Sequence, residues 1–129
     1  MESVKWEVGS AEIEFDFEKL SVYQKALSFV NAIFTLSDEF PSRVQYSLGD
    51  QLRRAVLSVV NNIAEGSGKR TAKEKLQLYH FALNSARECV PMLTVCREQE
   101  FITHTTHDLL RAQCFELCRM LRGLVKAVT

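Results

Sequence analysis

Residues 62–74, NIAEGSGKRTAKE, contain the end of one helix and the beginning of the next. Gly66-Ser67-Gly68 stops the first helix, because glycine readily adopts the left-handed conformation that often follows a helix. Thr71 and Glu74 then form a capping box, in which their side chains satisfy free amides at the start of the second helix. A connection this short predicts that the two helices pack side by side and antiparallel.

Apolar residues recur at intervals of three and four in four segments, which is the period of helices packed on one face. Pro41 ends the first segment, because proline disfavours the helical conformation in the preceding residue. Pro91 lies inside the third and predicts a kink, or a break near Glu88. Thr105 or Thr106 is expected to cap the fourth. The segments are 16–40, 46–65, 71–99 and 105–128, which predicts an all-α fold, an up-down antiparallel four-helix bundle.

Length and composition indicate one soluble domain. The chain has 129 residues, of which 47% are hydrophobic and 25% charged, and its formal net charge is +0. No segment approaches the roughly 20 apolar residues of a membrane span, and the start lacks the basic and apolar regions of a signal peptide. We therefore expect a cytoplasmic protein whose cysteines are free thiols.

The chain is expected to divide into an extended acidic N-terminal arm, residues 1–15, and the bundle, residues 16–129. Around the end of the arm, Ile13, Phe15 and Phe17 alternate with acidic residues, which is the period of a strand. A single strand has no stability of its own, so the arm is expected either to dock on the bundle or to fray.

The third segment carries two apolar stripes, which together cover more than half of its circumference. A monomeric bundle has only one core, so this surface favours a subunit interface and hence a homo-oligomer. Burial by loops or by the arm is the alternative. The stripes are Leu76, Tyr79, Leu83, Ala86, Val90 and Leu93, and Leu78, Ala82, Ser85, Cys89, Met92 and Cys96.

The fourth segment has a basic face that includes one aromatic residue and no acidic residue. Such a face supplies the phosphate contacts and the base stacking that nucleic-acid binding needs. A solvated face, or a clamp for the acidic arm, is the alternative. Basic residues before the third segment, beside its free amides, are suited to hold a further phosphate. The candidate nucleic-acid-binding residues are Lys69, Arg70, Lys73, Arg111, Phe115, Arg119, Arg122 and Lys126.

Arg53 lies in an otherwise apolar arc of the second segment, so its guanidinium needs a partner when it is buried. The expected partner is an acid on a neighbouring helix or subunit, and a bound phosphate is the alternative. Arg54, Ser58, Asn61 and Glu65 share the opposite face, either as a recognition ridge or as a solvated surface. The residues expected to have structural or interface roles are Arg53, Arg54, Asn62, Glu65 and Gly66.

The arrangements that would indicate catalysis or cofactor binding are incomplete. Gly66 and Gly68 are too close for the phosphate-binding loop of nucleotide hydrolases, which needs G-x-x-x-x-G-K-[ST] after a strand. The four cysteines fall on apolar stripes and form no C-x-x-C pair, as expected of cysteines that pack as small hydrophobes. We therefore expect no enzyme activity, no metal, no cofactor and no small-molecule substrate.

The second segment and its flanks resemble a known family. The resemblance lies in Phe40-Pro41, Gln51-Leu52-Arg53-Arg54-Ala55 and Asn62-Ile63-Ala64-Glu65-Gly66. Over residues 17–128 the chain resembles the four-helix-bundle proteins encoded in intervening sequences of bacterial 23S ribosomal RNA genes. It is more distantly similar to the accessory variability proteins of diversity-generating retroelements, pentameric barrels that bind a reverse transcriptase and nucleic acid. The resemblance implies a bundle assembled as a ring, typically a homopentamer.

The chain departs from the family pattern at a few positions. Val44 replaces the usual glutamate, Ser47 and Asn84 replace glycines, and the acidic arm is longer than usual. The resulting hypothesis is a ring-forming, non-enzymatic bundle that binds structured RNA or a nucleoprotein partner through its basic surface. The alternative is a protein-interaction scaffold that binds no nucleic acid.

Overall fold

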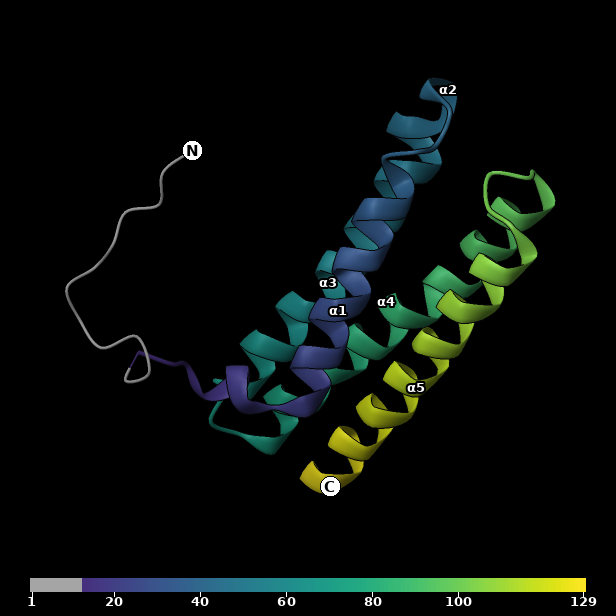
Figure 1. The fold of residues 1–129 in the computed structure, drawn as a ribbon. Coiled ribbons are helices and arrows are strands. Elements are labelled where there is room, and N and C mark those ends of the chain that lie inside the picture. The colour runs from purple at the N-terminus through teal and green to yellow at the C-terminus, as the bar shows by residue number, and fades with distance from the viewer. Residues whose placement is uncertain (1–12) are drawn as a thin grey trace.

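The structure, a computed structural model, describes residues 13–129 and forms an antiparallel four-helix bundle. Two helical hairpins, α1 with α3 and α4 with α5, pack together so that α3 lies against α4 (Figure 1). No helix in this range is long and apolar enough to cross a membrane. The long helices are α1 (Ser21–Ser37), α3 (Asp50–Ser67), α4 (Ala72–Glu98) and α5 (His104–Val128), and the short ones are η2 (Asp16–Lys19), α2 (Ser42–Val44) and η3 (Gln45–Gly49). The predicted fold class is confirmed.

Helix α4 lies between α3 and α5, so the chain itself covers two sides of this helix. Every residue of the two apolar stripes predicted for it is buried or half-buried. The wide apolar surface of α4 therefore reflects two neighbouring helices, and it does not by itself require a subunit interface. The fully buried core includes Phe29, Ile33, Leu52, Ile63, Leu93, Leu117 and Leu121.

The first predicted helix is divided in the structure. The 3-10 helix η2 ends at Lys19, and Leu20 is extended, with ψ 126°, before α1 begins. Phe17 therefore belongs to a helical turn and does not continue a strand-like arm. Its ring packs edge-on against Tyr23, with centroids 4.9 Å apart. Residues 1–12 of the expected arm lie outside the described residues.

The second predicted helix begins earlier than expected, at Ser42, immediately after Pro41. Pro41 is the N-cap residue, with φ −54° and ψ 144°, so its missing amide costs the helix no hydrogen bond. The backbone then passes through the π-helical turn η3, and Gln45 in this turn reaches back to the end of α1. Its Nε2 donates to the carbonyl oxygens of Ser37 (2.7 Å) and Phe40 (3.0 Å), which lie at the end of α1 and in the turn that follows it.

The glycine-rich step ends α3 at Ser67, but not through the predicted left-handed cap. Gly68 has φ −86°, and no glycine among the described residues has a positive φ. Gly66 is required by packing instead, because an added Cβ would lie 2.6 Å from Cε1 of Tyr79 on α4. Lys75 Nζ caps the helix by donating to the carbonyl oxygens of Gly66 (3.3 Å) and Ser67 (2.9 Å).

Helix α4 begins at the predicted capping residue. Thr71 Oγ1 accepts a hydrogen bond from the amide of Glu74 at 3.1 Å. The Glu74 carboxylate accepts from the Thr71 hydroxyl at 2.9 Å and does not bond the Thr71 amide, so the box is only half formed. The helix continues through Pro91 to Glu98, and the predicted break near Glu88 is absent from it.

Helix α5 begins at His104, one residue before the predicted start at residue 105. Its cap is Thr103, which accepts from the amide of Thr106 at 3.1 Å, and neither Thr105 nor Thr106 has this role. The preceding turn places Glu100 at φ 62°. The ring of Phe101 in this turn lies under Arg43, whose guanidinium carbon is 5.3 Å from the ring centroid. The contact joins α2 to the α4–α5 connection.

Candidate functional site

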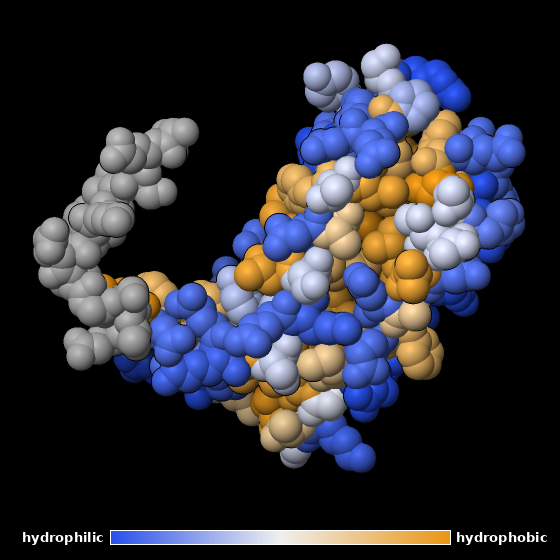
Figure 2. All heavy atoms as spheres, viewed as in Figure 1, coloured by the Kyte–Doolittle hydropathy of each residue, from blue (hydrophilic) through white to orange (hydrophobic). Residues whose placement is uncertain are grey.

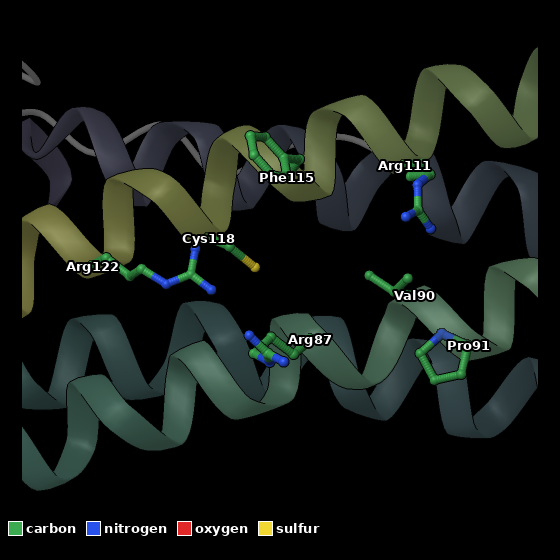
Figure 3. Close-up of a pocket in the computed structure, with 7 residues that line it drawn as sticks. All are labelled: Arg87, Val90, Pro91, Arg111, Phe115, Cys118 and Arg122. Atoms are coloured by element: carbon green, nitrogen blue, oxygen red, sulfur yellow. The ribbon is translucent and has the colours of Figure 1, made fainter.

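The basic face of α5 borders a groove between α4 and α5. Figure 3 shows Arg122 and the sulfur of Cys118 pointing from α5 into the space between the helices, with Arg87 entering from α4. The groove has a volume of about 340 Å³, which is within the range of small-molecule sites. We call it the arginine groove and define it by its lining residues, Arg87, Val90, Pro91, Arg111, Phe115, Cys118 and Arg122.

The packing of α5 on α4 brings these side chains together. The Cys114 thiol donates to the carbonyl oxygen of Ala86 at 3.1 Å, which places this part of α5 beside Arg87. Arg87 was missing from the predicted site, because its position opposite the basic face depends on the antiparallel register of the two helices. The pattern of α4 alone shows only a charged residue beside an apolar stripe.

The arginine groove carries concentrated positive charge. Arg87, Arg111 and Arg122 line it, and none of its lining residues is acidic. Across residues 13–129, no ion pair within 4.0 Å involves any of these three arginines. Unneutralised guanidinium groups in one groove favour an anion, and their planar donors suit phosphate or carboxylate oxygens.

Arg119 differs from its neighbours on α5, because it is paired. Its Nε donates to Oε2 of Glu116 at 2.9 Å, and its NH2 group donates to Oε1 of the same residue. The pair lowers the pKa of the Glu116 carboxyl group and raises that of the Arg119 guanidinium. The predicted free basic face is therefore wrong at Arg119, since an acid one turn earlier neutralises it.

The remaining predicted basic residues do not line the groove. Lys69, Arg70 and Lys73 belong to the α3–α4 connection and the first turn of α4, and Lys126 belongs to the last turn of α5. Figure 1 shows the C-terminus at the same end of the bundle as this connection. These residues thus add positive charge beyond one end of the groove.

Arg53 has partners within its own chain. Its guanidinium donates to Ser37 Oγ (2.9 Å), to Gln45 Oε1 (3.3 Å) and carbonyl oxygen (2.7 Å), and to Asp50 Oδ1 (2.9 Å). The acid lies on the same helix, and the prediction of an acid from a neighbouring helix or subunit is wrong. An added Cβ at Gly49 would lie 3.0 Å from the guanidinium, so this glycine leaves room for it. Arg53 therefore connects α1, η3 and α3.

The polar residues of α3 are divided between packing and solvent. Ser58 faces α4, with its hydroxyl 2.8 Å from that of Ser85, so it does not belong to an exposed ridge. The Asn62 side chain donates to the Ser58 carbonyl oxygen at 2.8 Å and to its hydroxyl at 3.0 Å. The other polar-face residues, Arg54, Asn61 and Glu65, are exposed.

The cysteines are free and buried, but they differ in acidity. Burial raises the pKa of Cys89 to about 12 and that of Cys96 to about 11. A hydrogen bond with Cys118, and burial, raise the pKa of Cys114. The same hydrogen bond lowers the pKa of Cys118 to about 7, against the effect of burial and with help from Arg122 and Arg87.

The Cys114 proton has two possible acceptors, the Ala86 carbonyl oxygen and the Cys118 sulfur. Arg122 and Arg87 favour the Cys118 thiolate, whereas burial of the sulfur opposes it. No group of three histidine, cysteine or acidic side chains within the described range is placed to hold a metal ion.

The architecture places the chain in the class of small up-down four-helix-bundle proteins. It belongs to the 23S rRNA-intervening sequence protein family, whose sequence profile matches residues 18–123. A solved structure from Bacteroides thetaiotaomicron VPI-5482, described as a protein with unknown function from the S23 ribosomal protein family, has the same fold. The TM-score is 0.76 at 22% identity, over 81% of this chain and 98% of that one. No curated protein matches the chain.

Proposed function

We propose that this protein is a non-enzymatic, cytoplasmic binding protein that holds structured RNA, alone or in a nucleoprotein, in the arginine groove. The observation that carries the proposal is the convergence of Arg87, Arg111 and Arg122 from two helices on one groove without a lining acid. Phosphate oxygens are the abundant anions of RNA, and guanidinium groups bind them through paired donors.

The length of the groove suits several nucleotides. Arg111 and Arg122 are 11 residues apart in the sequence (122 − 111), which is about 16 Å along a helix at 1.5 Å per residue. Phosphates of one strand advance by about 3.4 Å per nucleotide along a duplex axis, so the two arginines can contact phosphates several nucleotides apart.

Phe115 supports binding to unpaired bases. Its side chain lines the groove and is 69% exposed. An exposed ring beside arginines offers a stacking surface, and sequence-tolerant stacking contributes about 1–3 kcal/mol per base. Loops and bulges of a structured RNA present such bases.

The test is an RNA titration at two salt concentrations with matched arginine variants. Arg87→Gln with Arg122→Gln should weaken binding at least about tenfold. The pair should also reduce the dependence of affinity on salt, because a protein that contacts fewer phosphates displaces fewer counterions from the RNA. Arg43→Gln with Arg54→Gln removes the same charge from exposed residues outside the groove and should change affinity about twofold or less. Equal weakening by both pairs would argue for a diffuse charge effect and against this groove.

Arg119 provides a second control on the same helix. Because Glu116 already neutralises it, Arg119→Gln should change RNA affinity much less than Arg122→Gln does. If wild-type protein binds no RNA even at low salt, the alternative of a protein-interaction scaffold gains support.

We also propose that the protein acts as a homo-oligomer, a ring of the pentameric kind that the family resemblance implies. Figure 2 shows hydrophobic side chains gathered on the face over α1 and α5. Exposed large apolar residues on these helices include Leu27 and Leu109. Contiguous exposed apolar surface on a soluble domain is typical of interfaces.

A further inference from the structure

Among the described cysteines, Cys118 is the one whose side chain lines a surface groove. Cys89, Cys96 and Cys114 are 0% exposed, whereas Cys118 retains 5% exposure at the wall of the arginine groove. Figure 3 shows its sulfur pointing into the space between α4 and α5, with Arg87 and Arg122 extending into the same space. A thiol therefore lies at the wall of a groove that three arginines line.

The groups around this sulfur come from both helices. Arg87 and Cys89 approach from α4, and Cys114 and Arg122 belong to its own helix. The two cationic groups stabilise a thiolate, and the thiolate is the nucleophilic form of cysteine. Electropositive surroundings and access to solvent distinguish reactive cysteines from inert buried ones, and Cys118 has the first of these with 5% of its surface exposed.

We propose that Cys118 is a modification site that forms mixed disulfides with small acidic disulfides bound in the arginine groove. Carboxylates of the bound disulfide would contact the arginines, while Val90, Pro91 and Phe115 provide apolar contacts for its carbon atoms. The groove volume, about 340 Å³, accommodates a molecule of this class.

The reaction is a thiol–disulfide exchange. After the thiol proton passes to water, Cys118 Sγ attacks one sulfur of the acidic disulfide. The new S–S bond forms as the original one breaks, and the second half of the disulfide leaves as a thiolate with the electron pair of the broken bond. Cys118 is oxidised and the incoming disulfide is reduced, so no further oxidant is needed.

The product would regulate the groove. An acidic group attached to Cys118 lies among the arginines that the proposed function assigns to RNA phosphates, so the modified protein should bind RNA more weakly. This consequence depends on the proposed function. The reactivity of Cys118 does not, because it can be measured without RNA.

The test compares two aromatic disulfides of different charge on the folded full-length protein. The probes are 5,5′-dithiobis(2-nitrobenzoate), which carries two carboxylates, and 4,4′-dithiodipyridine, which is uncharged at neutral pH. Each releases a product that is followed by its absorbance, and peptide mass mapping locates the modified cysteine. We expect the fastest-reacting thiol to be Cys118, and Cys118→Ser should abolish this phase. Cys96→Ser, which removes a fully buried thiol outside the groove, should leave it unchanged.

The arginine variants then test the role of charge. Arg87→Gln with Arg122→Gln should lower the rate ratio of the acidic to the neutral probe at least about tenfold, the lower end of the effect of charge-lined clefts. Arg43→Gln with Arg54→Gln should leave the ratio within about twofold. The proposal is overturned if Cys118 reacts no faster than Cys96, or if both pairs of variants change the ratio equally. A protein that shows selective labelling but binds no RNA would refute the proposed function and leave this site standing.

Discussion

Arg53 shows how a charged side chain is accommodated in an apolar arc of α3. Its side chain is 17% exposed and bonds to Ser37, Gln45 and Asp50. A hydrogen-bonding role within the subunit thus accounts for this arginine. Sequence pattern predicted that it needs partners, but it could not identify them, because the π-helical turn that brings Gln45 beside it has no recognised sequence signal.

Arg53→Ala should lower the free energy of unfolding by about 3 kcal/mol, because it leaves the Gln45 carbonyl and the Ser37 hydroxyl without their charged donor. The neighbouring Arg54 is exposed, and Arg54→Ala should change stability by less than about 0.5 kcal/mol. Urea unfolding measures both variants. Similar midpoints would show that the Arg53 bonds contribute little.

Two glycines in helices are expected to respond oppositely to alanine. Gly66→Ala places a Cβ 2.6 Å from the buried ring of Tyr79, which should destabilise the protein by about 1–3 kcal/mol through overpacking. Gly123 has no atom within 4 Å of an added Cβ, so Gly123→Ala should stabilise it by about 0.5–1 kcal/mol. Thermal unfolding of both variants measures this contrast. A neutral Gly66→Ala would mean that α3 and α4 can separate slightly at this point.

Helix boundaries illustrate what the sequence can and cannot predict. Periodicity identified the four long helices and their antiparallel order, and Thr71 was correctly placed as the cap of α4. The start of α5 was wrong, because several threonines near it are chemically equivalent as caps and only the turn at Glu100 selects Thr103. Boundaries that depend on a turn geometry are thus less predictable than those marked by a complete motif.

The cap of α5 can be tested directly. Thr103→Ala removes the acceptor for the Thr106 amide, and it should cost about 1 kcal/mol, as lost N-caps do. Thr105 is exposed in the first turn, so Thr105→Ala should stay within about 0.5 kcal/mol of the wild type. Chemical denaturation distinguishes the two, and a larger loss at Thr105 would place the helix start where the sequence pattern did.

The candidate site was only partly predictable for a similar reason. Arg111, Phe115 and Arg122 share one face of α5 and were found from its period. Arg87 was missed because it belongs to another helix. The ion pair that neutralises Arg119 depends on the side-chain conformations of Arg119 and Glu116, which a sequence pattern does not give. A helical wheel describes one helix, whereas this groove is formed by two.

Assembly is a property of the whole molecule. The prediction that the protein forms an oligomer rests on the apolar face over α1 and α5. Light scattering at micromolar concentration should give a mass several times 14.7 kDa. Leu27→Glu or Leu109→Glu, each at an exposed apolar position, should reduce that mass without unfolding the chain, because a charge at a buried interface is unfavourable. A monomer in the wild-type protein would contradict the proposed ring.

Helix α1 contacts its neighbours less extensively than α4 does, and its contact with α5 is the weakest between long helices that are neighbours in the bundle. In local unfolding, the segment with the fewest buried contacts opens at the lowest free energy. Backbone amides of α1 in a monomer should therefore exchange with deuterium before those of α4, measured by mass spectrometry of peptides from each helix. If subunits cover α1 in an oligomer, dilution should accelerate exchange there first. The rate at which α1 opens would then report how much of the protein is assembled.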